Sequence, residues 1–248
     1  MIKNTAGNLT YYTSQLLDDL DVAHGFFTRH GGVSTDKMRS LNIKKSADDE
    51  DKNVSENRKR MCTALGLDAA KLIFANQLGH GDKGKFVGRA QAGQEFPGLD
   101  SLVTKTVEIP LALSVADCAP VILAAKDKAA TSVMHVSWRS LNAGIIQTTL
   151  DLLNSKELVV AVGPCIAVDS YEVQQDFVDA LKPRFSKFLK TVATKTFFDL
   201  PVATVAELER HGIGDIDTAN IDTATNTNDF YSYREEGTTG RFGAIVSL

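Results

Sequence analysis

The sequence predicts a mixed fold, α/β or α+β, built around one contiguous core. Short apolar segments rich in Val, Ile and Phe alternate with fewer segments of helical length. Hydrophobic residues make up 43% of the 248 residues, enough to offset the cost of ordering the backbone. Neither a Pro/Gly/Ser-rich linker nor a repeat of about 20–50 residues divides the chain. We therefore expect a single domain over residues 1–248.

The apolar runs place the expected strands, and two of them form an expected hairpin. Residues 126–128 are a polar turn between two apolar runs, so residues 121–136 are expected to fold as an antiparallel hairpin. The Gly-rich stretch 79–98 is expected to form loops around a short strand. Strands are expected at 25–28, 71–75, 85–87, 111–115, 121–125, 131–136, 158–162 and 243–248.

Helix signals lie between these strands. A helix is expected over 51–65, because this segment begins with acidic residues and is followed by Gly66. A second helix is expected over 174–181, and Pro183 ends it. A helix over 142–153 follows the hairpin directly. Another over 201–210 begins with Pro201 and ends before Gly212.

Charge and composition exclude several classes of protein. The 27 Lys and Arg against 31 Asp and Glu give a net charge of −4, which argues against a nucleic-acid partner. The longest apolar runs have the length of strands, so no membrane span is expected. The first ten residues lack the profile of a secretory signal. Three cysteines do not make a disulfide framework, and we expect a cytoplasmic protein with reduced thiols.

Three residues are candidates for chemistry. Cys118 and His135 flank the predicted hairpin, which brings such ends together, and His80 lies between two glycines. A His, Cys, His set fits a zinc site that leaves one position for water or substrate. The same residues could instead form a metal-free Cys–His dyad in which Cys118 attacks. Taken singly, each is more commonly structural, and the sequence leaves both chemistries open.

Polar residues near these candidates could contact a ligand. Asp117 adjoins Cys118 and could orient a metal-binding histidine. Arg29 precedes the pair Gly31–Gly32, whose backbone N–H groups could form an anion nest. Arg241 lies near the C-terminus among aromatic residues, and its planar guanidinium suits a phosphate or carboxylate.

Ordered motifs over about residues 24–248 resemble the laccase-domain family, also called the YfiH/YlmD or polyphenol-oxidase-like family. The resemblance begins with FTRHGGVS at 27–34 and includes ADCAPV at 116–121. Further matching motifs are LN at 41–42, ENR at 56–58, HVSWR at 135–139, GPCI at 163–166, YEV at 171–173, DL at 199–200, YSYR at 231–234 and TGR at 239–241.

The resemblance implies a four-layer α/β/β/α fold with mixed sheets and a zinc site on His80, Cys118 and His135. It implies a purine nucleoside phosphorylase that acts on adenosine, inosine, guanosine or methylthioadenosine with phosphate, and possible adenosine deamination. We take Cys118, His135 and Arg29 as catalytic residues. Copper is less expected than zinc, because a laccase copper cluster needs more than the five histidines present. The predicted substrate-binding residues are Arg29, Asn42, Asp117, Arg139 and Arg241.

The chain departs from the family pattern before His80. The family has Gln-Val-His-Gly, whereas here Leu78 and Gly79 separate Gln77 from His80. Two other functions therefore stay open: a metal-free Cys–His hydrolase that acts on an amide such as a peptidoglycan precursor, and a binding protein without turnover.

Overall fold

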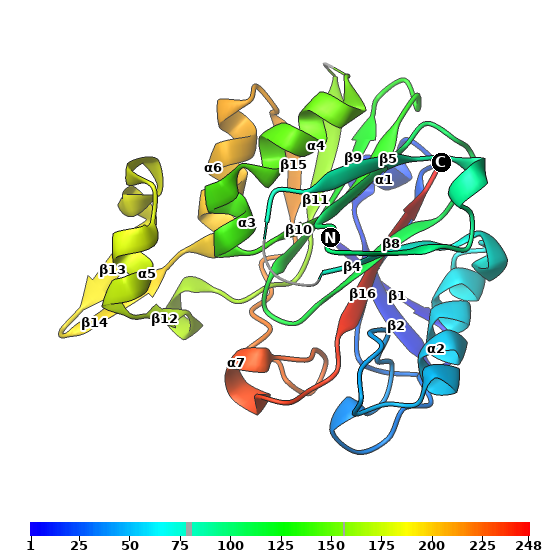
Figure 1. Cartoon of the computed structure of the whole chain (residues 1–248), viewed down its shortest axis with the longest axis horizontal. Coiled ribbons are helices and arrows are strands. Elements are labelled where there is room, and N and C mark those ends of the chain that lie inside the picture. Colours follow the sequence, from blue (N-terminus) through cyan, green and yellow to red (C-terminus); the bar gives the residue numbers. More distant parts are fainter. Residues whose placement is uncertain (78–80, 156) are drawn as a thin grey trace.

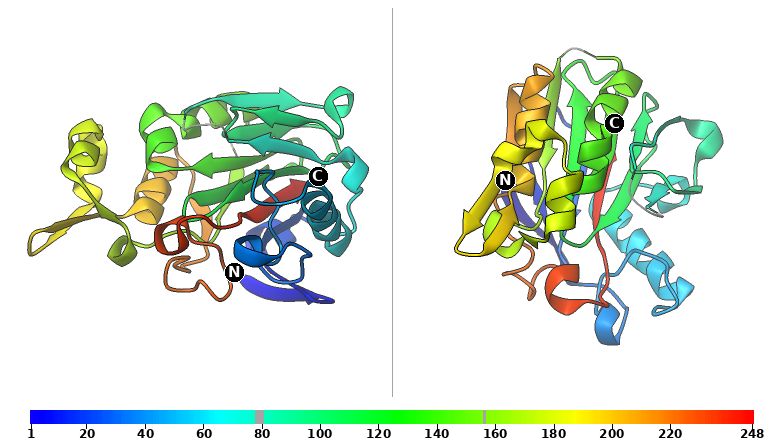
Figure 2. Two further views of the ribbon diagram at one scale, coloured as in Figure 1. Left: turned by 60° about the horizontal axis from the view of Figure 1, so that its bottom comes forward. Right: turned by 60° about the vertical axis from the view of Figure 1, so that its left-hand side comes forward.

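Two β-sheets packed face to face form the centre of the molecule, and helices cover their outer faces (Figures 1 and 2). The computed structural model describes residues 1–77, 81–155 and 157–248. Within these residues, the side chains between the sheets form one apolar cluster, and each outer face carries another. This order of layers confirms the predicted α+β fold with an α/β/β/α sandwich.

One large sheet contains both ends of the chain. In spatial order its described strands are β1 (Ile2–Ala6), β2 (Leu9–Thr13), β3 (Ala23–Phe27), β16 (Phe242–Ser247), β8 (Leu111–Val115), β4 (Ile73–Asn76) and β6 (Glu95–Pro97). Strand β4 runs parallel to β8 and β6, whereas the other neighbours are antiparallel, so the sheet is mixed.

The second large sheet carries the predicted hairpin. In spatial order its described strands are β15 (Asp215–Thr218), β11 (Leu158–Val162), β9 (Ala119–Ala125), β10 (Thr131–Val136), β7 (Ser101–Thr104) and β5 (Gly84–Val87). Strands β9 and β10 pair antiparallel, with His135 opposite Pro120, which confirms the hairpin. The outer pairs, β15 with β11 and β5 with β7, are parallel.

Helices seal the outer faces of both sheets. Helix α2 (Asp51–Ala64) buries Met61 and Cys62 against the first sheet. Helices α3 (Trp138–Ala143), α4 (Ile145–Leu153) and α6 (Leu200–Arg210) pack on the second. The single helix expected over 142–153 is divided because Gly144 adopts a φ of 113°, a conformation open to glycine. The described part of the chain has no helix long and apolar enough to cross a membrane.

An arm projects from one end of the sandwich (Figures 1 and 2). It is a small antiparallel sheet of β12 (Glu172–Val173), β14 (Lys195–Phe198) and β13 (Leu189–Val192), together with α5 (Gln175–Ala180). The Phe177 and Phe198 rings pack 5.2 Å apart within the arm, and Phe177 joins it to the helical layer through the Trp138 ring of α3, 4.4 Å away. Short helices α1 (Gln15–Asp18) and α7 (Tyr233–Glu236) complete the fold, with 3-10 turns at Asp36–Met38, Ala69–Lys71, Arg89–Gln91, Val168–Ser170 and Pro183–Phe188.

Candidate active site

Cys118 and His135 meet at the open end of the hairpin. Cys118 immediately precedes β9, and His135 is the penultimate residue of β10. The Cys118 thiol lies near enough to the imidazole to raise the pKa of His135. The hairpin register therefore brings together two of the three residues predicted for chemistry.

Asp100 orients the imidazole from the neighbouring strand. It lies just before β7, and its Oδ1 is 2.7 Å from Nδ1 of His135. Its backbone carbonyl also accepts a hydrogen bond of 2.7 Å from the His135 N–H. The second carboxylate oxygen, Oδ2, accepts a hydrogen bond of 3.1 Å from the backbone N–H of Gly81. Because Asp100 occupies Nδ1, the other ring nitrogen is the one available to Cys118 or a metal.

The neighbours of His135 favour its charged form. Burial lowers the pKa of the imidazole, but the Cys118 charge and the hydrogen bonds to Asp100 and Cys118 outweigh burial and raise it to about 9. The corner thus stabilises a proton on the imidazole through two acidic partners.

The donor set of this corner suits zinc. A thiolate and an imidazole nitrogen are common Zn²⁺ ligands, and Asp100 supplies the carboxylate that a metal-binding histidine typically contacts. Within 1–77, 81–155 and 157–248, no group of three or more His, Cys, Asp or Glu residues could hold a metal. The expected third ligand, His80, lies outside the described residues. Gly81, the next residue along the chain, is bound to the same Asp100 that holds His135.

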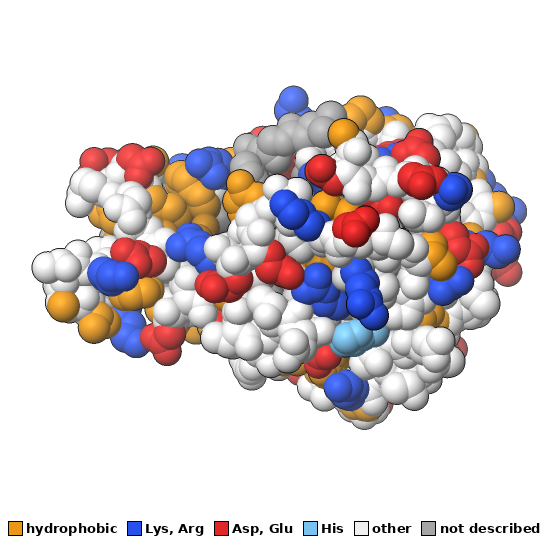
Figure 3. Space-filling model, turned by 90° about the horizontal axis from the view of Figure 1, so that it is seen from below, with side chains coloured by type: hydrophobic (Ala, Val, Ile, Leu, Met, Phe, Trp, Pro, Cys, Tyr) orange, Lys and Arg blue, Asp and Glu red, His pale blue; other side chains and the backbone are white. Residues whose placement is uncertain are grey.

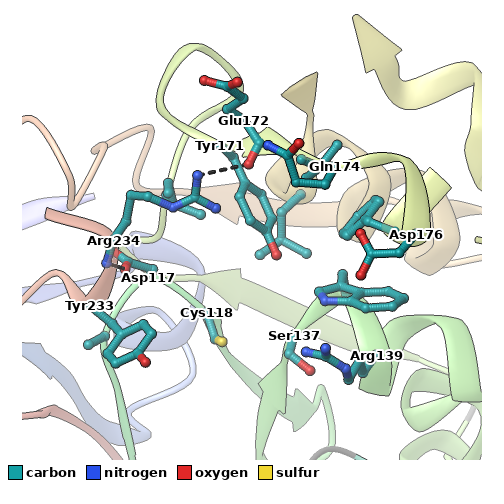
Figure 4. Close-up of a pocket in the computed structure, with 16 residues that line it drawn as sticks. Asp117, Cys118, Ser137, Arg139, Tyr171, Glu172, Gln174, Asp176, Tyr233 and Arg234 are labelled. Carbon is teal, nitrogen blue, oxygen red and sulfur yellow. Dashed lines mark hydrogen bonds between the residues drawn. The ribbon is translucent and has the colours of Figure 1, made fainter. Parts of the chain in front are cut away.

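A pocket of about 460 Å³ opens in front of Cys118 (Figure 4). One wall comes from the sandwich, with Cys118, Ser137 and Trp138, and the facing wall comes from the arm. Figure 4 shows Tyr171 and Asp176 across the pocket from Cys118 and Ser137. This volume lies in the range that holds small organic ligands.

Aromatic rings line much of this pocket. The Trp138 and Phe177 ring centroids are 4.4 Å apart, and Tyr171 meets Phe177 edge to face at 6.1 Å. The guanidinium of Arg139 lies 4.5 Å from the Trp138 ring at the exposed rim. Such rings stack favourably on a planar heterocycle.

Asp117 shapes the wall beside Cys118 instead of orienting the histidine. Its oxygens accept hydrogen bonds from the Thr223 hydroxyl at 2.8 Å and the Arg234 backbone N–H at 2.7 Å. Its φ of 80° turns the chain just before β9, and Pro120 lies within that strand. The carboxylate partner of His135 is Asp100, which corrects the role expected for Asp117.

The Arg29 side chain is held by contacts with other protein groups. Its guanidinium donates to Glu236 at 2.8 Å and to the Thr227 carbonyl at 2.6 Å, and it lies 4.3 Å from the Tyr231 ring. Arg29 does not line the Cys118 pocket. Because a carboxylate already neutralises it, its contacts do not support the predicted phosphate role.

The glycine pair beside Arg29 binds the protein itself. The Gly32 N–H donates to the Ser40 hydroxyl, and the Val33 N–H donates to Asn57. A Cβ on Gly32 would lie 2.1 Å from the Ser40 carbonyl oxygen, so the glycine permits a close backbone approach. The nest expected there faces residues 40–57 instead of an anion.

Asn42 holds two cationic residues in place. Its Oδ1 accepts from the backbone N–H groups of Lys44 and Arg241, and its Nδ2 donates to the Lys44 carbonyl and to Asp49. The side chain is fully buried, with both amide protons and the carbonyl oxygen bonded. We therefore infer a positioning role for Asn42 in place of the predicted substrate contact.

Sequence reasoning missed two residues of this site, Asp100 beside His135 and Tyr171 in the pocket wall. Asp100 precedes the apolar run of β7, which was not among the expected strands. An acidic residue at the start of an apolar run was the signal that could have identified it, because a carboxylate in a sheet core needs a partner.

Comparisons with known proteins agree with this architecture. Residues 23–248 match the family described as multi-copper polyphenol oxidoreductase laccase. A purine nucleoside phosphorylase of Deinococcus radiodurans is 34% identical over 237 residues, which are 93% of this chain and 90% of that protein. One from Streptomyces coelicolor is 29% identical over 240 residues, covering 93% and 98% of the two chains.

Solved structures share the whole fold. YlmD from Geobacillus stearothermophilus superposes with a TM-score of 0.90 at 25% identity, covering 98% of this chain and 97% of that one. YfiH from Bacillus licheniformis gives the same TM-score at 24% identity, covering 99% and 98% of the two chains. The match over residues 23–248 and the 34% identity together show that this chain belongs to the multi-copper polyphenol oxidoreductase laccase family.

Proposed function

We propose that this protein is a zinc-dependent purine nucleoside phosphorylase. It takes adenosine, inosine, guanosine or methylthioadenosine with phosphate and releases the base and the sugar 1-phosphate. The observation that carries the proposal is the aromatic pocket whose inner wall holds Cys118, beside His135 and Asp100. The relatives named purine nucleoside phosphorylase support it.

The reaction breaks the bond between C1′ and N9 and forms a bond between C1′ and a phosphate oxygen. The base leaves with the electron pair of the broken bond and takes up a proton. Positive charge therefore develops on the ribose and negative charge on the base, and both must be stabilised in the transition state.

The pocket residues suit the nucleoside half of this reaction. Trp138, Tyr171 and Phe177 offer ring faces to the purine, and the Asp176 carboxylate in the arm can accept a hydrogen bond from a ring N–H. Arg139 at the rim remains a candidate contact for an anionic group.

Cys118, His135 and His80 are the residues proposed to hold zinc, with Asp100 behind His135. When bound, zinc supplies Lewis acidity that orients the substrate and a hydroxide suited to adenosine deamination. The chain's own contribution is to fix the imidazole by the Asp100 carboxylate and to keep Cys118 at the pocket surface. The three free cysteines fit a reducing compartment, and we propose the cytoplasm.

The decisive experiment compares the wild type with Cys118→Ala. Inosine is supplied with and without phosphate, adenosine is assayed for ammonia, and zinc is measured in the same samples. We expect hypoxanthine and ribose 1-phosphate only when phosphate is present, with about one zinc per chain. Cys118→Ala should lose zinc and lower turnover by about 10³-fold or more, because it removes an anionic group from the reacting site.

Cys62→Ala is the matched control, because Cys62 is buried under α2 in a different apolar cluster. It should retain both zinc and turnover. Wild-type turnover in Cys118→Ala, or base release independent of phosphate, would contradict the proposal.

A second candidate function, a metal-free cysteine hydrolase, rests on Cys118, His135 and Asp100. In this arrangement Cys118 is the nucleophile, His135 beside it is the base, and Asp100 orients the base, as in a cysteine hydrolase. Such an enzyme would act on an amide, a peptidoglycan precursor among the possible substrates. Amide hydrolysis that persists after zinc is removed by a chelator would favour it.

A binding protein without turnover is the third candidate, because the segment before His80 is one residue longer than the family pattern. Saturable nucleoside binding in zinc-loaded protein, with no product from any nucleoside or amide, would favour it.

A further inference from the structure

A second hollow adjoins the nucleoside pocket. It has a volume of about 200 Å³, and its lining includes Asn42, Lys44, Asp48, Tyr233 and Arg241. Tyr233 lines both cavities, and Figure 4 shows it beside Cys118. The hollow therefore opens next to the place where the C1′ bond would be broken.

Two cations in this hollow lack an acidic partner. Within the described ranges, neither Lys44 nor Arg241 has a carboxylate oxygen within 4.0 Å, although Arg29 and Arg58 each pair with a glutamate at 2.8 and 2.9 Å. Arg241 instead donates to the Thr239 and Gly240 carbonyls. Burial and the neighbouring Arg241 charge lower the pKa of Lys44. Two like charges held together are unfavourable unless an anion joins them.

The fold imposes this juxtaposition through Asn42. Its single Oδ1 accepts from both the Lys44 and Arg241 backbone N–H groups, although these residues are far apart in sequence. The backbone of Lys44 is thus fixed on both its N–H and its carbonyl, which leaves the side chain available to a ligand. Figure 3 shows Lys and Arg side chains gathered near the middle of the face turned down in Figure 1.

The hollow is also electrostatically close to the reacting corner. Burial lowers the pKa of Arg241, and the Cys118 charge is the strongest of the influences that raise this pKa. The same charge also raises the pKa of Lys44, which burial and Arg241 lower. A dianion between these cations would therefore lie within reach of the chemistry at Cys118.

We propose that Lys44 and Arg241 form the phosphate subsite of this enzyme, with Tyr233 between it and the nucleoside. The inference rests on the proposed phosphorolysis. A planar guanidinium and an ammonium supply several charge-assisted hydrogen bonds to a phosphate dianion, and Asn42 positions both.

Lys44→Gln tests the subsite in steady-state kinetics with inosine and phosphate varied separately. We expect the KM for phosphate to rise about tenfold or more, since a charge-assisted contact is lost. The KM for inosine should change less than about twofold. Lys44→Arg should restore most of the phosphate affinity. Lys45→Gln is the matched control, because this neighbour is exposed and pairs with Asp51.

Direct binding separates failure of the subsite from failure of the proposed reaction. Inorganic phosphate is titrated calorimetrically into wild type and Lys44→Gln without nucleoside. Phosphate binding that Lys44→Gln abolishes supports the subsite, even if no phosphorolysis is found. Phosphorolysis whose phosphate KM and phosphate binding are unchanged in Lys44→Gln overturns the subsite and leaves the reaction standing.

The phosphate group of a nucleotide is the other source of the same anion. Adenosine 5′-monophosphate is therefore titrated in parallel. Binding that is tighter than that of inorganic phosphate, and that also depends on Lys44, would overturn free phosphate as the ligand.

Discussion

The Cys118 corner and the Lys44–Arg241 hollow lie side by side but differ in how their charges are balanced. In the corner, His135 has Asp100 on one side and Cys118 on the other. In the hollow, two cations share an amide oxygen of Asn42 through their backbones and have no carboxylate partner within the described residues. The imidazole of the corner thus has an acidic group on each side, whereas the two cations of the hollow have none within 4.0 Å among the described residues.

The Asp100→Asn variant tests the corner and should have the larger effect. The asparagine side chain loses the negative charge, and it cannot accept from both His135 and Gly81, because one oxygen becomes an amide donor. We expect zinc affinity or turnover to fall about 10–100-fold. Competition with a chelator measures zinc affinity, and kcat/KM for inosine measures turnover.

Asp127→Asn is the control, because that carboxylate lies in the exposed turn between β9 and β10. Unchanged zinc affinity and turnover in Asp100→Asn would mean that the carboxylate is not needed to orient His135.

The Arg29→Gln variant tests the contrast between Arg29, which pairs with Glu236, and Arg241, which has no carboxylate partner among the described residues. Arg29 contacts Glu236 and several carbonyls, so its loss should lower the free energy of unfolding by about 1–2 kcal/mol, allowing for solvent at the partly exposed Glu236. The KM for phosphate should stay near the wild-type value. Urea unfolding and phosphate kinetics measure the two effects.

Arg39→Gln removes the same charge from an exposed side chain and serves as the control. A rise in phosphate KM for Arg29→Gln that matches Lys44→Gln would restore Arg29 as a phosphate ligand and break the comparison.

The smallest expected effect is a pH dependence at Glu236. Burial raises its pKa, but hydrogen bonds from Arg29, Ser232 and Thr239 outweigh burial and lower it below the ordinary value of 4.5. The stability from these bonds is therefore present above about pH 4.5 and is lost as pH falls through the folded-state pKa. The unfolding free energies of wild type and Glu236→Gln should converge as pH falls from about 7 to about 3.5. A constant difference across this range would exclude the ion pair as its source.

Much of the sandwich could be predicted because its strands are buried on both faces. The runs that became β9 and β11 are continuously apolar, those that became β8 and β10 are largely so, and all four strands are buried along their whole length. The edge strands β1 and β15 and the arm strand β13 were missed, since half-exposed strands carry polar residues and give a weaker signal. The candidate site shows the same difference. Cys118 and His135 could be predicted from the ends of the hairpin, but Asp100 could not, because it precedes the strand β7, which was not expected.

The sequence by itself determined a mixed fold of helices and strands, the hairpin that joins Cys118 to His135, and, through its ordered motifs, the family and its four-layer architecture, since apolar periodicity and motifs are local properties. Only the tertiary structure decided which charged residues pair with an opposite charge and which do not. Arg29 and Arg241 look equivalent in the sequence, yet one meets Glu236 and the other meets Lys44. Charge compensation depends on which side chains the packed sheets and loops bring within a few ångströms, and no local pattern records that proximity.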